Sequence, residues 1–254
     1  MKINPKQLAT AEPKPMDKPE IVLAKAHRTP GRKPTPTPDE IYERVISAIF
    51  EHRLAPGTKL GEDRLALIFG VSRSRIRPAL ARLAHEKLVR LEPNRGAFIA
   101  APTPEEAREI FEARRLIEPG VVRRLAKTID GEGIERLRSL VREEGAARAR
   151  SDRRSIIRMS GEFHIAAAEM AGNTFLARTM RELATLTCLI IFLYDSPSIP
   201  SCHGDEHAEI TDAIAAKDAE RAMRLMLQHL KHVESSLELR GDKPLGLELE
   251  QVFQ

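Results

Sequence analysis

The most chemically informative run in this 254-residue sequence holds three arginines at alternate positions, Arg73, Arg75 and Arg77. A planar guanidinium can donate two parallel hydrogen bonds to guanine or bind a phosphate. Cations at the start of a helix oppose its dipole by about 0.3–1 kcal/mol each, so such a cluster favours a polyanionic ligand over a gain in stability. The alternative interpretation is a surface helix whose first arginines are simply solvated.

Histidines form the second group of residues with chemical potential, and His164, His207 and His229 each lie in a different helical segment. Imidazole is a good ligand for zinc, nickel, copper and iron, so one histidine from each of three helices could bind a single metal ion. An isolated histidine on a helix is more often a core or boundary residue. Spacing alone leaves both interpretations open.

The arginines need an element that presents them, and hydrophobic spacing predicts one. Apolar residues recur at helical spacing after a Thr-Pro-Asp-Glu start, and two shorter helices and two short apolar runs follow. The predicted elements are helices 38–50, 62–69 and 73–87, and a hairpin of 88–91 and 97–100. Such an order is a winged helix-turn-helix, whose third helix enters the major groove of DNA. At the hairpin tip, Gly96 permits close approach to a backbone and Arg95 can reach a phosphate, although a plain turn would look similar.

The histidines lie in a region that is helical almost throughout. The predicted helices are 104–129 (with a kink at Pro119), 132–149, 152–171, 174–194, 204–216 and 218–239. The helix 174–194 is apolar nearly all round near its end, which places it in the centre of a bundle or in an oligomer interface. The expected fold class is therefore mainly α, with an N-terminal winged helix-turn-helix and small β-hairpin followed by a C-terminal antiparallel all-α bundle.

Composition and charge narrow the class of protein. No apolar run approaches the ~18–20 residues that span a bilayer, and two cysteines, Cys188 and Cys202, suggest reduced thiols in a cytosol. Without tryptophan, aromatic stacking on single-stranded nucleic acid is an unexpected mode. The net charge of +4 divides into a basic part, +5 over 1–37 and +3 over 38–101, and an acidic part, −4 over 102–254. We expect a disordered basic Pro-rich arm (1–37), a DNA-binding domain (38–101), an all-helical domain (102–240) and a loose tail (241–254).

Several motifs taken together are similar to those of a known family. They are Ala55-Pro56-Gly57-Thr58-Lys59-Leu60, Phe69-Gly70-Val71-Ser72-Arg73, Asn94-Arg95-Gly96-Ala97-Phe98-Ile99, Arg114-Arg115-Leu116-Ile117-Glu118-Pro119, Phe163-His164, Ala171-Gly172-Asn173, Glu206-His207-Ala208-Glu209-Ile210 and Met226-Leu227-Gln228-His229-Leu230. The chain resembles the GntR superfamily of bacterial transcription regulators from about residue 41 to about 239, and its helical part resembles the FadR branch.

The resemblance implies a dimeric, ligand-responsive regulator that binds double-stranded DNA, and it makes the all-helical part (102–240) the effector-binding and dimerisation domain. The DNA-binding residues that we expect from it and from the arginine pattern are Ser72, Arg73, Arg75, Arg77, Arg64, Arg95 and Gly96. In metal-binding members of the branch, three histidines and an aspartate hold a divalent metal (Zn, Ni, Mn or Fe) beneath a small organic acid, which carries over to His164, His207 and His229. Arg114 is then expected to bind the carboxylate, with Asn173 and Ser160 as further effector-binding residues. A structural pair of Arg114 with Glu118 is the alternative.

Three positions depart from the family pattern. Ser160 stands where the metal-ligand aspartate is expected, and a hydroxyl is a far weaker ligand. Asp63 stands where the second helix usually has an arginine, with Arg64 beside it, which puts one DNA contact in doubt. Pro78 lies inside the predicted recognition helix, where it removes a backbone hydrogen bond.

The leading hypothesis is a cytoplasmic, nucleoid-associated regulator without enzyme activity. A homodimer would bind a palindromic operator, most commonly as a repressor, and a small carboxylate would control it. The alternative is a three-histidine metalloenzyme with an accessory nucleic-acid-binding module. Against it, the sequence has no nucleophile motif, and the one carboxylate near His164, Glu162, is two residues away and would point elsewhere on a helix. A third option is an architectural or co-repressor protein that binds DNA without a small ligand.

Overall fold

The computed structural model describes residues 35–195 and 205–239. Most of the predicted N-terminal arm, the predicted tail from 241, and Cys202 lie outside these residues. Within the described ranges no helix is both long enough and apolar enough to cross a membrane.

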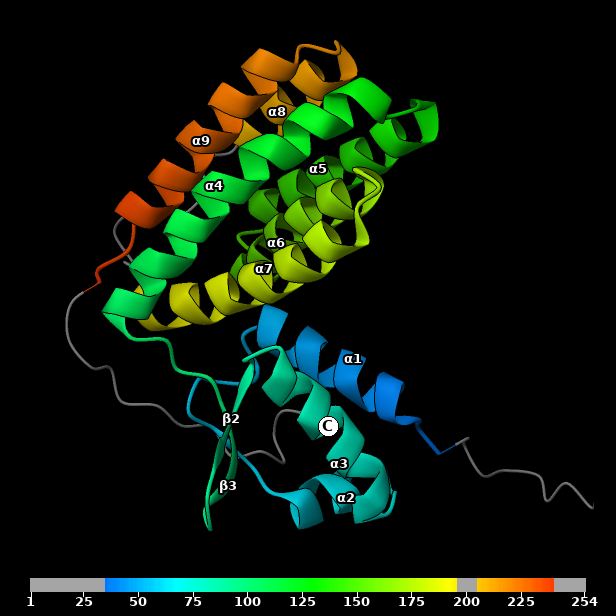
Figure 1. The fold of residues 1–254 in the computed structure, drawn as a ribbon, viewed down its shortest axis with the longest axis vertical. Helices are drawn as coiled ribbons and strands as arrows, with labels where there is room; N and C mark the ends of the chain where they lie inside the picture. The colour runs from blue at the N-terminus through cyan, green and yellow to red at the C-terminus, as the bar shows by residue number, and fades with distance from the viewer. Residues whose placement is uncertain (1–34, 196–204, 240–254) are drawn as a thin grey trace, which may run out of the picture. The chain divides into compact units, whose positions relative to one another are not determined.

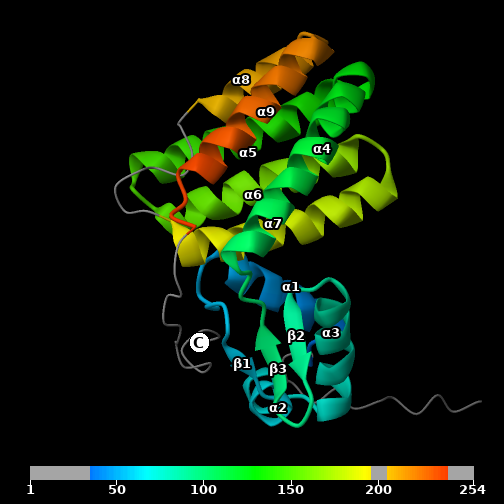
Figure 2. The same ribbon diagram turned by 60° about the vertical axis from the view of Figure 1, so that its left-hand side comes forward.

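The N-terminal elements are three helices and a three-stranded antiparallel sheet of order β1-β3-β2. They are α1 (Pro38–Phe50), β1 (Lys59–Leu60), α2 (Glu62–Phe69), α3 (Arg73–His85), β2 (Val89–Glu92) and β3 (Gly96–Ile99). Figure 2 shows the strands beside α2 and α3. The predicted helices and hairpin are present. The additional strand β1 was not predicted, because two residues are too few to show an alternation of apolar and polar residues.

Local sequence explains where these helices begin and end. Thr37 and Glu40 form a reciprocal capping box at the start of α1. Gly70 ends α2 with φ 64°, a left-handed conformation that glycine adopts without strain. Ser72 is the N-cap residue of α3, but its side chain makes no capping bond and its hydroxyl lies 2.8 Å from that of Ser74. The helix continues through Pro78 to His85.

The remaining elements are six helices. They are α4 (Pro104–Thr128), α5 (Gly131–Ala149), α6 (Arg153–Met170), α7 (Thr174–Tyr194), α8 (Glu206–Ala215) and α9 (Ala219–Ser235). The last helix ends four residues before the predicted 239, because the chain then turns to pair Leu237 with Asp195. Helix α7 has twelve buried residues, as its apolar sequence predicted. Figure 1 shows α4 lying along α9, its most extensive partner.

The end of α1 and the residues just after it pack against the helical region, and two of these contacts are especially close. The Phe50 ring lies over Gly161 of α6, where an added Cβ would be 2.4 Å from Cε1 of that ring. The His52 imidazole lies 3.1 Å from the carbonyl oxygen of Cys188 in α7 and against the Phe192 ring. The winged region and the helical region therefore share one hydrophobic cluster.

Candidate DNA-recognition surface and histidine cluster

Helix α3 presents its arginines outward because its apolar residues face the other way. Ile76 is fully buried and Leu80 is 5% exposed, which orients the helix against α1 and α2. The side chains of Arg73 and Arg77 are 61% and 65% exposed. The first turn of α3 thus offers its guanidinium groups to solvent, as a major-groove helix must.

Carboxylates that the sequence analysis did not assign contact three of the predicted DNA-binding arginines. Two are at the start of α2, where Asp63 pairs with Arg73 and Glu62 pairs with Arg77 at 2.9 Å. On the β2–β3 hairpin, Arg95 lies 2.5 Å from Glu92. Since the first two pairs join α2 to α3, spacing along the sequence gave no direct signal for them.

The other predicted DNA-binding positions also lie on exposed chain. Arg75 donates to the carbonyl oxygens of Thr35 and Pro36 at 3.5 and 3.4 Å, and Arg64 is exposed on α2. Gly96 has φ 102° at the tip of the hairpin, and a Cβ added there would meet nothing closer than Lys59 Cε at 3.6 Å. Glycine is therefore required at position 96 by the positive φ of the backbone and not by lack of space for a side chain.

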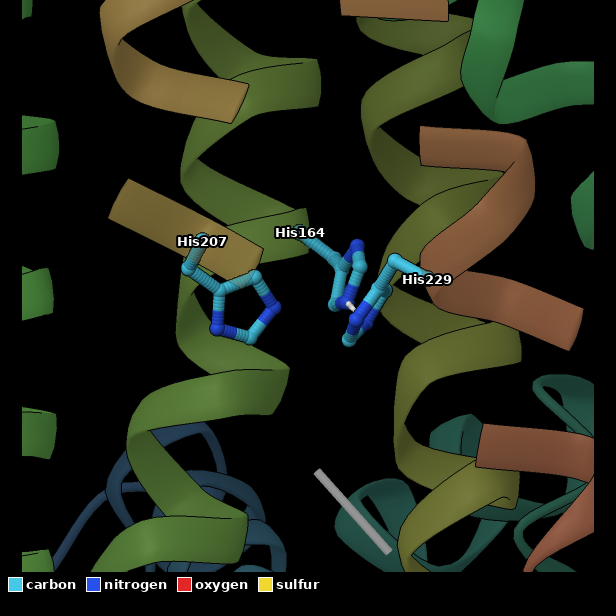
Figure 3. Close-up of side chains that lie close together, drawn as sticks. All are labelled: His164, His207 and His229. Carbon is cyan, nitrogen blue, oxygen red and sulfur yellow. Dashed lines mark hydrogen bonds between the residues drawn. The ribbon is translucent and has the colours of Figure 1, made fainter. Parts of the chain in front are cut away.

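His164, His207 and His229 come together inside the helical region, on α6, α8 and α9 (Figure 3). All three side chains are at most 3% exposed, and one ring nitrogen of each lies within 4.8 Å of the others. The Nε2 atoms of His164 and His229 are 3.2 Å apart. The structure therefore brings together the three histidines that the sequence analysis singled out.

Each of these imidazoles has a carboxylate on its Nδ1 side. The contacts are Glu118 of α4 with His164 at 2.5 Å, Glu144 of α5 with His207 at 2.7 Å, and Glu206 of α8 with His229 at 2.8 Å. A carboxylate on the second nitrogen is the arrangement that orients metal-ligating histidines. Sequence reasoning did not identify Glu144 or Glu206, and Glu144 lies 63 positions from its histidine, so no local pattern pointed to it.

Burial and the neighbouring carboxylates determine the protonation of two of the rings. Burial lowers the pKa of His164 to about 4 and of His229 to about 3, so both rings are neutral near pH 7. A carboxylate only accepts hydrogen bonds, so the proton of each of these two rings belongs on Nδ1, beside its glutamate. The Nε2 of His207 is buried and has no hydrogen-bond partner among the described residues. Three ring nitrogens therefore converge, an arrangement that a bound cation would stabilise.

The charges around the rings also fit a cation. Burial opposes ionisation of Glu118, but Arg114 and His164 outweigh it and hold the pKa of the carboxyl at about 2. Around the three rings lie the charged side chains of Arg114, Glu118, Glu144, Arg148 and Glu206. Their net charge is −1, so a divalent cation would change it to +1 and leave a net attraction for an anion.

Arg114 is the predicted effector residue whose surroundings are most informative. It is 2% exposed, its Nε pairs with Glu118 at 2.5 Å and its Nη1 donates to Thr187. The structural alternative for Arg114 is therefore present, yet its buried Nη2 has no partner among the described residues. Asn173 caps α7 through its side-chain oxygen, and Ser160 lies on α6 one turn before His164. Their effector-binding roles remain predictions.

Comparison with protein families matches two adjoining stretches. Residues 37–99 match the family described as bacterial regulatory proteins, gntR family, and residues 109–232 match the FCD domain. The first stretch contains the arginine surface and the second contains the histidine cluster.

Individual relatives match most of the chain. The chain is 27% identical over 203 residues to the HTH-type transcriptional repressor RspR of Escherichia coli, covering 80% of this chain and 89% of the relative. It is 28% identical over 206 residues to the HTH-type transcriptional regulator LutR of Bacillus subtilis, covering 72% and 93%. Among solved structures, a GntR transcriptional regulator from Rhodococcus sp. RHA1 matches with a TM-score of 0.68 and 26% identity, covering 78% of this chain and 95% of that chain.

Proposed function

The chain belongs to the GntR family of bacterial transcription regulators, in the FadR-type branch whose sensor is an FCD domain, and from this premise we propose that it is a metal-dependent repressor released by a small carboxylate. Family membership makes it a DNA-binding regulator rather than an enzyme, so the metalloenzyme alternative is not retained. The proposal goes further in assigning a metal, an effector class, a palindromic operator and a dimer. We also propose that the boundary between the DNA-binding and sensor domains lies near 101 and that the protein acts on the bacterial nucleoid.

The single observation that carries the metal proposal is the convergence of one ring nitrogen from each of three imidazoles whose other nitrogens face carboxylates. His164, His207 and His229 would hold a divalent ion that accepts an anionic oxygen as a further ligand. Glu118, Glu144 and Glu206 keep the protons on Nδ1, which leaves the ligand nitrogens free.

Metal analysis tests this assignment. Protein purified without added metal salts should contain close to one equivalent of a divalent ion per chain, and His229→Gln should lose most of it. His85→Gln, at an exposed histidine of α3, is the matched control and should retain the metal. A content below a tenth of an equivalent, equal in wild type and in His229→Gln, would instead identify a metal-free pocket and favour a regulator without this ligand.

Arg114 supports a carboxylate as the effector. Its unpartnered Nη2 is a buried donor beside a cluster whose charge becomes positive when a cation binds. A charge-assisted hydrogen bond to a carboxylate would satisfy it. Calorimetric titration of small 2-hydroxy and dicarboxylic acids into metal-loaded protein should give binding that Arg114→Gln weakens at least tenfold. Equal affinity in that variant would remove Arg114 from the effector site.

Two adjacent residues of α7 connect the proposed effector site to the winged domain. The Thr187 hydroxyl accepts from Arg114, and the carbonyl of the next residue, Cys188, contacts His52 at the end of α1. Phe50, also at the end of α1, rests on Gly161, three residues before His164 on α6. A shift of α6 or α7 on effector binding would therefore move the winged domain, which changes operator affinity.

A face of α4 supports the proposed homodimer. At 100° per residue, its exposed positions 105, 109, 112, 116, 120, 123 and 127 fall within roughly 80° of arc. Leu116, 78% exposed, lies at the centre of this stripe. Acidic residues precede it and basic residues follow it, so a second copy packed antiparallel would place Glu109 opposite Arg123 and Glu105 opposite Lys127. Gly120 adds open space for the approach of the second helix.

Charge reversal tests this antiparallel pairing. Glu109→Arg and Arg123→Glu should each give mainly monomers in analytical ultracentrifugation, because like charges then face each other at both ends of the stripe. An equimolar mixture of the two variants should restore dimers, since each unlike pair is re-formed between the different chains. If both variants stay dimeric, or if the mixture stays monomeric, the stripe is not the dimer interface.

A further inference from the structure

Two carboxylates occupy a surface that is expected to approach a polyanion. Glu62 and Asp63 form the first turn of α2, and they contact Arg77 and Arg73 of α3 respectively. All four side chains remain substantially exposed, from 37% for Glu62 to 70% for Asp63. The acids are favourable to the dipole of α2, but this role does not require contact with arginines of another helix.

We propose that Glu62 and Asp63 are specificity-determining residues that suppress binding to arbitrary DNA while leaving recognition of guanine intact. The inference rests on the DNA-binding role of the winged domain and goes beyond it, because it assigns a function to acidic residues. Non-specific binding is driven by phosphate charge and counterion release. An arginine that is already neutralised by a carboxylate releases fewer counterions, and the carboxylate itself repels the phosphate.

Base recognition has a different requirement. In both pairs the closest contact is made by arginine Nε. Approach along the Nε edge leaves the edge formed by the two terminal nitrogens for an incoming base, and guanine offers two neutral acceptors, O6 and N7, to that edge. Arg73 and Arg77 can then donate to guanine without breaking their ion pairs. The carboxylates also restrict guanidinium rotation, which favours one fixed geometry over a variable phosphate contact.

Arg75 serves as an internal contrast. It lies between the two paired arginines on α3, and among the described residues its guanidinium donates to the carbonyl oxygens of Thr35 and Pro36 rather than to a carboxylate. Its charge is not compensated by these contacts. Arg75→Ala should therefore weaken binding to selected and to shuffled DNA by a similar factor and reduce the salt slope by about one unit.

The proposal is tested with an isosteric double variant, Glu62→Gln with Asp63→Asn, in the full chain. A DNA duplex is first selected by wild-type protein from a random pool, and a shuffled duplex of equal length and composition is the comparison. Fluorescence anisotropy between 50 and 300 mM KCl measures affinity for both. At 150 mM KCl the variant should bind shuffled DNA about three- to tenfold more tightly, and its log–log salt slope should be steeper by about one to two units. Selected DNA should gain less, so that the ratio of the two affinities falls at least threefold.

The control is Asp39→Asn, which removes an exposed carboxylate paired with Arg82 near the opposite end of α3. It should leave the affinity ratio within a factor of two of wild type.

An unchanged ratio in the double variant would overturn the proposal. So would a loss of affinity for selected DNA alone, which would mean that the acids accept hydrogen bonds from cytosine. If wild-type protein selects no preferred duplex, the DNA-recognition assignment fails instead, and the two failures are distinguishable. Asp63→Asn alone should show the same changes at about half the size.

Discussion

The arginine surface and the histidine cluster use the same chemical pairs in opposite surroundings. On the surface, Arg73 and Arg77 pair with carboxylates while remaining more than 60% exposed. In the interior, Arg114 pairs with Glu118, and each of these two side chains is only 3% exposed. Exposed ion pairs contribute about 0–1 kcal/mol to folding, whereas removing one partner of a buried pair costs about 3–5 kcal/mol. A substitution in a surface pair can therefore change DNA binding with little effect on stability, whereas a substitution in an interior pair lowers the stability of the fold.

The largest expected effect tests this contrast directly. Glu118→Gln leaves the buried guanidinium of Arg114 without its counter-charge and removes the acceptor from His164. We expect the free energy of unfolding of metal-free protein, measured in urea, to fall by about 3 kcal/mol. Asp63→Asn breaks a pair of the same chemistry at the surface and should change it by less than about 0.5 kcal/mol. Equal effects of the two variants would show that the distinction between the regions is wrong.

The reverse experiment measures binding instead of folding. Arg73→Ala and Arg77→Ala should each weaken binding to selected DNA by about 1–3 kcal/mol. Their unfolding free energies should stay within about 0.5 kcal/mol of wild type, since both side chains are exposed. Wild-type affinity in both variants would exclude α3 as the recognition helix, and a large loss of stability would place these arginines with the interior pairs.

A third variant tests the contact that joins the two regions. Gly161→Ala places a Cβ 2.4 Å from the Phe50 ring, so α1 and α6 must separate or the ring must move. Overpacking of this kind costs about 1–3 kcal/mol, and the operator response to effector should weaken together with the stability. Gly145→Ala is the control, because a Cβ in that position of α5 meets nothing within 4 Å. It should be neutral or stabilising by up to about 1 kcal/mol. Adding Phe50→Leu to Gly161→Ala should recover part of the loss.

What the sequence could predict differs between these regions for physical reasons. Hydrophobic period and capping residues are local, so all three winged-domain helices and their hairpin were predictable, and α2 was placed at its observed ends, Glu62–Phe69. The exposure of Arg73 and Arg77 was predictable because both lie near the start of a helix whose apolar residues, Ile76 and Leu80, fix its buried side. The meeting of three histidines was only one of two interpretations from spacing, and the family resemblance favoured it.

The partners of these residues were beyond local patterns. Glu144 reaches His207 across 63 positions, and Asp63 meets Arg73 only because α2 and α3 pack together. Such contacts depend on tertiary arrangement, which periodicity does not encode. The same limit applies to β1, since a strand of two residues has no alternation and is defined by its pairing with β3.

The smallest expected effect concerns His52, which lies between the two regions. Burial lowers the pKa of His52 to about 4, below its ordinary value of 6.5, and its hydrogen bond to the Cys188 carbonyl only partly opposes the shift. In the unfolded chain the ring takes up a proton near pH 6.5, so unfolding is favoured as the pH falls from 6.5 towards 4, and stability is retained above 6.5.

We expect His52→Gln to remove about 1–2 kcal/mol of this pH-dependent loss, measured by urea unfolding of metal-free protein at pH 7.5 and pH 5. His85→Gln, at an exposed ring, should keep the wild-type pH profile. Parallel profiles for wild type and His52→Gln would mean that the ring at this junction is as free to be protonated as one in solvent, and the junction would then belong with the exposed surface and not with the interior.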